Sequence, residues 1–402
     1  MKYLILIGDG MADRPLPLLG GKTPLQAAHT PNMDRLAREG FAGAAVTLPN
    51  GLPNGSDVAN LSILGYDPRQ YYTGRAPFEA ASMGIDLAPN DVAFRCNLVT
   101  IGRNAAGNQV MEDHSAGQLT SAEGKILVEA LNTEVAGDGC DIKFYPGVSY
   151  RNIMIWPGGK AGADCTPPHD ILGKEIAAYM PRGEGAELIS KLMDISMMLL
   201  ENHPVNKERI SKGKRPANSI WLWGQGLKPG LKSFNSIYGK KGAMISAVDL
   251  TKGLAVAAGL SVINVPGATG YLDTNYKGKA EYALKALKDV DLVYVHVEAP
   301  DEASHEGKAE EKIKAIEDFD SLVVGTILEG LKDDCRVLLM PDHATPIEVR
   351  THTAEPVPFV IWESGKKQPG FEGGYNEAIT AAGKSQTEAH KLMGLLIKGE
   401  LS

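Results

Sequence analysis

Residues 2–10 read KYLILIGDG, an apolar run that ends at Gly8, Asp9 and Gly10. Such a run is typical of a buried parallel strand that opens onto a functional loop. Two later apolar runs are followed by polar and acidic residues in the same way. The expected strands are Lys2–Ile7, Val290–Val297 and Arg336–Met340, and the expected helices follow the N-cap signal at Thr30 and span Glu310–Leu331. This alternation predicts an α/β fold with a doubly wound sheet, in which ligands bind beyond the carboxyl ends of the strands.

The middle of the chain differs from its two ends in its Gly and Pro content and in the length of its expected strands. From about residue 78 to residue 215, Gly and Pro are frequent and the strand signals are short. Trp221, Trp223 and the run Ile245–Val265 return to the alternating pattern of a core. We therefore expect a core domain formed by residues 1–77 and 216–402, with residues 78–215 as a smaller inserted α+β domain.

The composition excludes several classes of protein. The chain has 402 residues, 43% of them hydrophobic, and 41 basic against 49 acidic residues give a net charge of −8, so no nucleic-acid partner is expected. Cys96, Cys140, Cys165 and Cys335 lie far apart without a C-x-x-C pair, which argues against a disulfide framework or a zinc ribbon. No apolar run approaches the length of a membrane span, and the opening run is too short for a signal peptide. We expect a cytoplasmic protein without a membrane partner, and predict no oligomeric state.

Carboxylates and imidazoles gather at the expected carboxyl ends of the strands. They are Asp9 after the first strand, Asp301 and His305 after the second, Asp342 and His343 after the third, and His352 nine residues further on. Asp301 and His305 are four residues apart, so one helical turn places them on the same face. Asp342 and His343 are adjacent and are expected to point apart, which suits one ligand on each side or a bridge between two ions. Oxygen and nitrogen donors of this kind bind zinc, manganese or similar divalent ions.

Each of these residues alone is weak evidence, because an aspartate at a strand end is more often a cap or turn residue. The set is strong evidence, since chance does not collect three carboxylates and three histidines at one sheet edge. His296 lies inside an apolar run and is expected to be a core histidine with its hydrogen bonds satisfied. His29, His203 and His390 lie outside any cluster and are expected to be structural or at the surface.

A candidate nucleophile lies in the segment Leu52–Asn60. Gly55 allows a tight turn, and Ser56 then begins a helix whose N–H groups and dipole favour a phosphate. A serine before a helix is usually an ordinary N-cap. The metal set favours Ser56 as a nucleophile instead, because a bound cation lowers the pKa of a hydroxyl enough for attack.

Together these motifs resemble the cofactor-independent phosphoglycerate mutases of the alkaline phosphatase superfamily. The resemblance is to the archaeal-type branch, which includes proposed homoserine kinases, and it covers nearly the whole chain. The matching segments are Gly8–Asp13, Thr23–Leu25, Thr30–Asp34, Gly55–Asn60, Ser62–Tyr66, Pro341–His343 and Thr351–Thr353.

The resemblance implies an alkaline-phosphatase-like core, an inserted substrate-binding domain and two divalent metal ions. Mn²⁺ is the expected metal, with Zn²⁺, Mg²⁺ and Co²⁺ as alternatives. By carry-over from the family, one ion is held by Asp9, Ser56, Asp342 and His343, and the other by Asp301, His305 and His352. Ser56 accepts the phosphoryl group and returns it to the other hydroxyl of a bound glycerate.

In the inserted domain the segments Glu112–Gly117, Pro146–Arg151 and Pro167–Asp170 look like motifs of the archaeal-type branch. Four residues in them are expected to bind substrate: Arg151 as a clamp for a carboxylate or phosphate, His114 as an acid or base, Asp170 as an orienting group, and His169 beside it. The arginine-rich patterns of the longer bacterial mutases are not recognisable here, so the resemblance does not identify the substrate clamp.

The resemblance favours interconversion of 3-phosphoglycerate and 2-phosphoglycerate through a phosphoserine. The alternative is a homoserine kinase on the same metal and serine site, although no P-loop or kinase glycine-rich loop is present. A phosphomonoesterase or sulfatase is less favoured, because a large inserted domain suits retention of the intermediate. A binding module without catalysis is the remaining alternative, and the complete ligand set argues against it.

Overall fold

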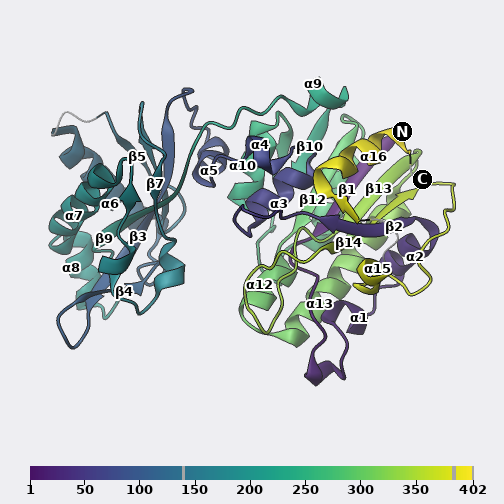
Figure 1. Cartoon of the computed structure of the whole chain (residues 1–402), viewed down its shortest axis with the longest axis horizontal. Helices are drawn as coiled ribbons and strands as arrows, with labels where there is room; N and C mark the ends of the chain where they lie inside the picture. Colours follow the sequence, from purple (N-terminus) through teal and green to yellow (C-terminus); the bar gives the residue numbers. More distant parts are fainter. Residues whose placement is uncertain (138–140, 383–385, 401–402) are drawn as a thin grey trace. The chain divides into compact units, whose positions relative to one another are not determined.

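The computed structural model describes residues 1–137, 141–382 and 386–400 and divides the chain into two compact units. Unit 1 comprises residues 1–72 and 230–402, and unit 2 comprises residues 73–229 (Figure 1). The expected boundaries at 78 and 215 therefore differ from those observed. Strand β9 (Ser219–Leu227) carries Trp221 and Trp223 and pairs with β3 (Val92–Arg103) in unit 2, so assigning these two residues to the core domain was wrong. Alternation predicts a strand but does not say which of two sheets receives it.

Unit 1 is built on one mixed sheet of eight strands. Their order across the sheet is β11-β10-β12-β1-β13-β14-β2-β15. The first five are parallel, β14 runs antiparallel to β13 and to β2, and β15 is parallel to β2. The strands are β1 (Lys2–Gly8), β2 (Phe41–Val46), β10 (Gly242–Ile245), β11 (Ser261–Ile263), β12 (Leu292–Val297), β13 (Cys335–Met340), β14 (Val357–Glu363) and β15 (Gln386–Glu388). The expected α/β class and the three expected strands are confirmed.

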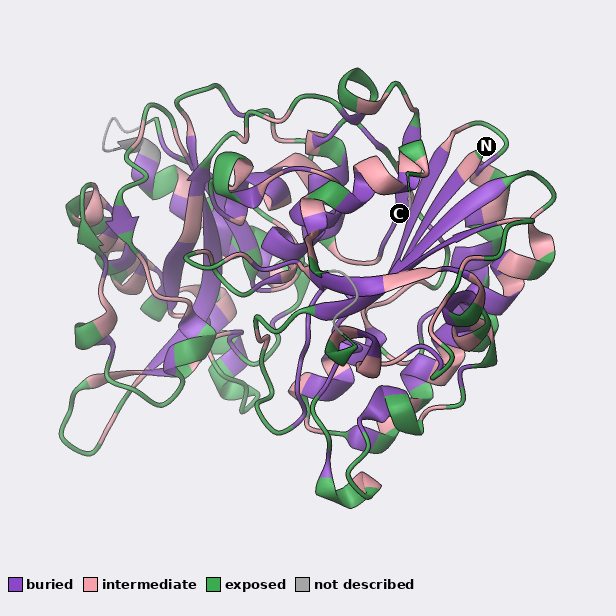
Figure 2. Cartoon of the chain, turned by 45° about the vertical axis from the view of Figure 1, so that its right-hand side comes forward, coloured by how far each residue is buried: buried purple, intermediate pink, exposed green. Residues whose placement is uncertain are grey.

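Helices cover both faces of this sheet (Figures 1 and 2). One face packs into the large core cluster with α2 (Pro31–Glu39), α11 (Tyr276–Ala286), α13 (Ala309–Asp318), η4 (Phe319–Gly325), α14 (Thr326–Gly330) and α15 (Ala378–Ala381). The second layer contains α3 (Ser56–Ile63), α10 (Asp249–Ala257) and α16 (Leu392–Lys398). Shorter helices of unit 1 are η1 (Pro17–Leu19), α1 (Pro24–Ala27), α4 (Pro68–Tyr71), α9 (Phe234–Tyr238), α12 (Ala299–His305) and η5 (Ala389–Lys391). The central strands β12, β1, β13 and β14 are buried from both sides, which explains their apolar sequences.

The helix expected at Glu310–Leu331 is present as three consecutive segments, in which the π-helix η4 lies between the α-helices α13 and α14. The wider turn carries Asp320, whose carboxylate accepts hydrogen bonds from the N–H groups of Asn32 and Met33 at 3.3 and 2.7 Å. Thr30 occupies the N-cap position of α2 but makes no side-chain cap hydrogen bond. Asp320, a residue distant in the sequence, therefore caps the helix that Thr30 was expected to cap.

Unit 2 has its own sheet and its own core. The five-stranded sheet contains β3, β4 (Gln109–Asp113), β5 (Lys143–Tyr145), β6 (Arg151–Trp156) and β9, and a separate pair is formed by β7 (Ala163–Asp164) and β8 (Arg182–Gly183). Its helices are α5 (Ala76–Ser82), α6 (Ser121–Gly137), η2 (Pro168–Ile171), η3 (Ile176–Tyr179), α7 (Ala186–Glu201) and α8 (Pro204–Ser211). A cluster of apolar side chains from the sheet and from α6 and α7 forms the core.

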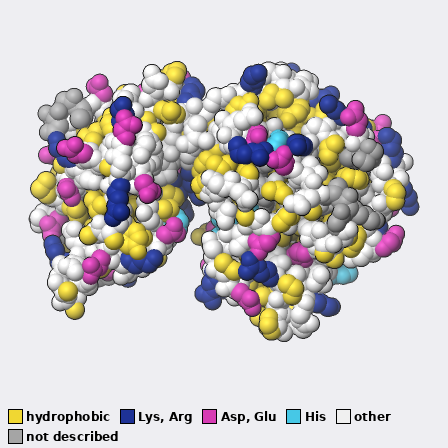
Figure 3. All heavy atoms as spheres, viewed as in Figure 1, with side chains coloured by type: hydrophobic (Ala, Val, Ile, Leu, Met, Phe, Trp, Pro, Cys, Tyr) yellow, Lys and Arg dark blue, Asp and Glu magenta, His cyan; other side chains and the backbone are white. Residues whose placement is uncertain are grey.

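Three further features of the described residues concern membrane helices, cysteines and surface charge. No described helix is both long and apolar enough to cross a membrane. Cys96, Cys165 and Cys335 are free thiols, and Cys140 lies outside the described residues. On the face of the molecule drawn in Figure 3, basic and acidic side chains are interspersed rather than gathered by sign.

Candidate metal centre and nucleophile

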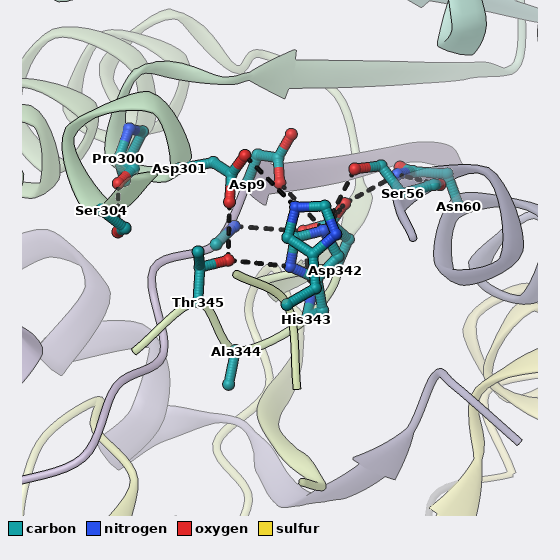
Figure 4. Close-up of polar contacts among 12 residues, drawn as sticks. Asp9, Ser56, Asn60, Pro300, Asp301, Ser304, Asp342, His343, Ala344 and Thr345 are labelled. Atoms are coloured by element: carbon teal, nitrogen blue, oxygen red, sulfur yellow. Dashed lines mark hydrogen bonds and ion pairs between the residues drawn. The ribbon is translucent and has the colours of Figure 1, made fainter. Parts of the chain in front are cut away.

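The metal-ligand candidates of the sequence meet in unit 1, beyond the carboxyl ends of the central strands (Figure 4). Asp9 follows β1, Asp301 and His305 lie on α12 after β12, and Asp342 and His343 follow β13. Asp9, Asp301, Asp342 and His343 are buried. Because β12, β1 and β13 are adjacent and parallel, their carboxyl ends bring these loops together.

One half of the centre surrounds the Ser56 hydroxyl. Ser56 Oγ lies 3.1 Å from His343 Nε2, which is also 3.5 Å from Asp9 Oδ1 and 3.5 Å from Asp342 Oδ2. Asp342 and His343 therefore converge, although neighbours on a strand were expected to point apart. They lie beyond the end of β13, where the alternation of a strand no longer applies. Asp9, Asp342 and His343 form one group with metal-ligand spacing.

The other half contains Asp301, His305 and His352. Asp301 Oδ2 lies 3.1 Å from His305 Nε2 and 3.6 Å from His352 Nε2, and the two imidazole nitrogens are 3.1 Å apart. The helical turn expected to align Asp301 with His305 is α12. Asp301 and His352 also have metal-ligand spacing with His343, so His343 belongs to both groups.

Hydrogen bonds at the Nδ1 atoms determine which nitrogen each imidazole presents to the centre. His305 Nδ1 lies 2.9 Å from the Arg350 carbonyl, and His352 Nδ1 lies 3.1 Å from the Asn54 carbonyl. A carbonyl only accepts, so both Nδ1 atoms must donate, and the neutral rings carry their lone pairs on Nε2. Two Nε2 lone pairs 3.1 Å apart beside a carboxylate require a cation, either a proton or a metal ion.

Thr345 determines the tautomer of His343 in the same way. Its hydroxyl donates to Asp301 Oδ1 at 2.6 Å and lies 3.1 Å from His343 Nδ1. The single hydroxyl hydrogen is already used, so His343 Nδ1 donates and Nε2 faces Ser56 with a lone pair. Metal-binding histidines usually have their second nitrogen fixed by such a hydrogen bond.

The pKa values show how strongly this arrangement attracts positive charge. Burial, reinforced by the neighbouring carboxylates of Asp342 and Asp301, raises the pKa of Asp9 well above its ordinary value. Burial opposes a charged His305, but its hydrogen bond and charge interaction with Asp301 prevail and raise its pKa to about 9. Burial lowers the pKa of His343 to about 4, so its ring is neutral at pH 7. Crowded carboxylates and outward lone pairs are the donor set that fits divalent cations.

Ser56 is the first residue of α3 and not its N-cap. Gly55 occupies the N-cap position without a side-chain cap hydrogen bond, and the Ser56 hydroxyl is directed to His343 instead. Asn60, one turn further along, donates to the Ser56 carbonyl and to Asp342 Oδ2, both at 2.8 Å. Its own side-chain oxygen accepts from the Tyr294 hydroxyl at 2.5 Å. The start of α3 is thus anchored to the Asp342 carboxylate beside Ser56.

Sequence reasoning missed part of this centre. Thr345 positions the ligand candidate His343, and Asn60 positions Asp342. Thr345 lies just after the motif Pro341–His343, and Asn60 is the last residue of the motif Gly55–Asn60. His296 is buried in β12 as expected, but neither ring nitrogen has a hydrogen-bond partner among the described residues, and Nε2 lies 3.3 Å from Asp9 Oδ2. The expectation of a satisfied core histidine was therefore wrong, because its alternating strand position placed it beside Asp9. Gly10 has φ +61°, and an added Cβ there would lie 2.5 Å from Asp301 Oδ1, so only glycine fits.

The candidate substrate-binding residues lie in unit 2. The His114 ring is 5.7 Å from the Tyr150 ring and 6.2 Å from the His169 ring, and the Arg151 guanidinium lies over Tyr150 at 4.6 Å. Asp170 is exposed, 3.6 Å from His169 Nε2. The structure therefore brings His114, His169 and Arg151 into one neighbourhood.

Two residues without a sequence signal join this neighbourhood. The Arg95 guanidinium lies 4.3 Å from the ring centre of Trp223, whose ring is 5.2 Å from that of His169. Arg95 is buried and pairs with Glu79 at 2.8 Å. The charge of Arg95 disfavours protonation of both His114 and His169.

Comparisons with known proteins identify the family. The chain is 54% identical to the 2,3-bisphosphoglycerate-independent phosphoglycerate mutase of Methanosarcina acetivorans, over 99% of this chain and 100% of that protein. The chain belongs to this family. The family model described as 2,3-bisphosphoglycerate-independent phosphoglycerate mutase matches residues 37–206. A probable mutase of the same description from Geobacter sulfurreducens is 52% identical over 99% of this chain and 100% of its own length.

Solved structures agree with membership of the 2,3-bisphosphoglycerate-independent phosphoglycerate mutases. The cofactor-independent phosphoglycerate mutase of Thermoplasma acidophilum has a TM-score of 0.66 at 28% identity and covers 99% of both chains. The PH0037 protein of Pyrococcus horikoshii has a TM-score of 0.83 at 32% identity, over 99% of this chain and 96% of that one. The resemblance drawn from the sequence motifs is confirmed, and the chain is an enzyme of this mutase family.

Proposed function

We propose that this protein interconverts 3-phosphoglycerate and 2-phosphoglycerate by transferring the phosphoryl group to Ser56 and back. The observation that carries the proposal is the Ser56 hydroxyl, which is not used as a helix cap and lies 3.1 Å from His343 Nε2 beside two aspartates. Relatives that match the chain over their full length bear the mutase name.

The proposal includes two divalent ions, with Mn²⁺ favoured. Asp9, Ser56, Asp342 and His343 would hold one ion, and Asp301, His305 and His352 the other, in agreement with the two neighbouring groups of donors. When bound, such ions lower the pKa of a hydroxyl and neutralise charge on a transferring phosphoryl group. The opposed Nε2 lone pairs of His305 and His352 support the fit.

Ser56 acts as the nucleophile in this proposal. Its oxygen forms a bond to phosphorus while the bond from phosphorus to the glycerate oxygen breaks. The proton that Ser56 loses is balanced by the proton that the departing glycerate oxygen takes up to become a hydroxyl. The reverse attack by the other glycerate hydroxyl restores Ser56 and completes the isomerisation. Gly55, Ser56 and Asp57 begin α3, so the N-terminal N–H groups and helix dipole favour the anionic intermediate.

The residues of unit 2 are proposed to bind the substrate through its anionic groups. Arg151 is exposed and suits bidentate binding of a carboxylate. Burial lowers the pKa of His114, and nearby Arg151 adds to the effect. His114 is proposed to act as a neutral hydrogen-bonding group, and His169, whose side chain is about half exposed, as a second one. Asp170 orients His169 in this proposal.

The experiment is turnover of 3-phosphoglycerate by the full chain loaded with Mn²⁺. The proposal expects 2-phosphoglycerate to form, and expects Ser56→Ala to abolish its formation. Ser321→Ala is the matched control, because Ser321 is exposed in the same unit and, among the described residues, its hydroxyl bonds only to the Glu317 carbonyl. A second incubation with homoserine and ATP tests the kinase alternative. Formation of O-phosphohomoserine, or release of inorganic phosphate without isomerisation, would refute the mutase proposal.

A further inference from the structure

A buried lysine lies behind the candidate metal centre and makes a complete set of hydrogen bonds. Lys312 is on α13, and its side chain has no exposed surface. Its ammonium group donates to Asp13 Oδ2 at 2.8 Å, to the Thr345 carbonyl at 3.0 Å and to the Ala12 carbonyl at 3.3 Å. Three N–H groups thus meet three acceptors, and each acceptor belongs to a loop that carries a ligand candidate.

These acceptors tie together the loops that follow two adjacent strands. Ala12 and Asp13 belong to the loop after β1, which begins with Asp9, while Thr345 follows β13, Asp342 and His343. The loops are also joined directly, because Thr345 N–H donates to the Ala12 carbonyl at 3.1 Å. The Asp13 carboxylate accepts from the Ile347 N–H at 3.2 Å. Lys312 and Asp13 therefore form the link at which the two loops are held in register.

The link reaches the ligands through the side chain of Thr345. The carbonyl of Thr345 accepts from Lys312, while its hydroxyl contacts His343 Nδ1 and donates to Asp301 Oδ1. Those contacts determine which nitrogen His343 presents to Ser56 and how Asp301 is oriented. Asp301 belongs to one half of the centre, and His343 has metal-ligand spacing with donors of both halves. A shift of Thr345 would therefore change both halves together.

The rest of the structure offers a comparison for this ion pair. Arg336, at the opposite end of β13, pairs with Glu363 at 2.8 Å and donates to the carbonyls of Leu396 and Ile397 at 3.0 and 2.9 Å. Each buried cation thus has one carboxylate and two carbonyls as partners. The six residues of β13 span about 20 Å, so Arg336 is remote from the centre. Buried ion pairs add little net stability, which leaves geometric placement as the specific effect of Lys312.

We propose that Lys312 is a positioning residue that, through Asp13 and Thr345, sets the geometry of both halves of the metal centre. This inference rests on the metal site of the proposed function. It assigns to α13 a role in ion binding although no side chain of that helix is a ligand candidate.

The test measures Co²⁺ binding to the full chain, first freed of metal by chelation. Calorimetry gives the affinity, and the visible absorption of bound Co²⁺ reports its coordination geometry. The variants are Lys312→Met, the neutral pair Lys312→Met with Asp13→Asn, and Thr345→Val. The neutral pair removes both charges, so no carboxylate is left buried without a partner. The matched control is Arg336→Met with Glu363→Gln, which removes an equivalent ion pair remote from the centre.

The proposal expects the Lys312 and Thr345 variants to bind Co²⁺ about 10-fold or more weakly and with an altered absorption spectrum. The control is expected to keep the affinity and the spectrum of the original protein. Unchanged affinity and spectrum in the folded neutral pair would overturn the inference while leaving the metal site intact. A neutral pair that does not fold, beside a folded control, would show a structural role and would also overturn it. Absence of Co²⁺ binding by the original protein would refute the proposed function itself.

Discussion

Binding of a divalent ion to this protein should release protons, and the structure predicts from which residues. Burial disfavours a charged His305, but its contacts with Asp301 raise its pKa to about 9, and those of His352 with the same carboxylate raise its pKa too. At pH 7 roughly 99 in 100 His305 rings therefore carry a proton in the metal-free protein. His343 is neutral at that pH, because burial lowers its pKa to about 4. An ion that takes the Nε2 lone pairs must displace the proton on His305 but none from His343.

The magnitude follows from the pKa of His305. Each pH unit below 9 weakens the apparent affinity about tenfold, so His305 alone accounts for a loss of about 100-fold between pH 9 and pH 7. The expected release at pH 7 is therefore about one proton from His305, to which His352 and Asp9, whose pKa values are also raised, can only add. The stability of the metal-free protein depends on pH in the opposite direction to its metal affinity. The raised pKa of His305 stabilises the metal-free fold below about pH 6.5, and this contribution is lost as pH rises through 9.

The assay is isothermal titration of metal-free protein with Mn²⁺ in two buffers of different ionisation enthalpy, repeated from pH 6 to pH 9. The difference in heat between the buffers gives the number of protons released. His305→Asn should lower this number by about one at pH 7. His343→Asn is the matched control, because it removes a ligand candidate that carries no proton. Release that is absent at pH 7, or unchanged by His305→Asn, would refute the assignment of lone pairs and charges.

Three further predictions concern stability, each measured by urea unfolding. Tyr294→Phe leaves the buried Asn60 oxygen without its donor and should lower the free energy of unfolding by about 1–3 kcal/mol, and an unchanged midpoint would contradict this. Burial tends to raise the pKa of Asp113, but its hydrogen bonds prevail and lower it to about 2. Asp113→Asn should therefore lower the free energy of unfolding by about 1 kcal/mol at pH 7 after solvent screening. This difference between variant and original protein should vanish as pH falls from 4 to 2. Glu79→Gln leaves Arg95 buried without its carboxylate and should lower the free energy of unfolding by about 3 kcal/mol. A decrease below about 1 kcal/mol would show that the Glu79–Arg95 pair is not desolvated.

Several parts of the centre were predictable because they depend on local sequence. Asp9 and Asp342 follow apolar runs that form buried strands, and Asp301 and His305 share a helical turn. Neighbouring parallel strands end at one sheet edge, so donors at those ends must meet. The start of α3 at Ser56 followed equally from Gly55 and the helical pattern after it.

Other parts were not predictable because they depend on contacts between distant segments. Lys312 shares the buried face of α13 with Ala309 and Ala315, where a lysine is unusual. This helical spacing was visible in the sequence, but its meaning became clear only once the structure showed the buried partners of Lys312. His296 was expected to be satisfied, and its position beside Asp9 depends on the pairing of β12 with β1. The unit boundary near residue 229 depends on the pairing of β9 with β3.

The sequence by itself determined the family, the α/β class and the set of candidate metal donors, because motifs, apolar runs and helical spacing are local properties of the chain. Only the tertiary structure decided which nitrogen each imidazole presents and which halves share His343. It also decided which buried cation joins the two ligand loops. Some of the hydrogen-bond partners involved are hundreds of residues apart, as for His352 with Asn54 and Lys312 with Asp13. A partner is defined by distance and direction in space rather than by position along the chain.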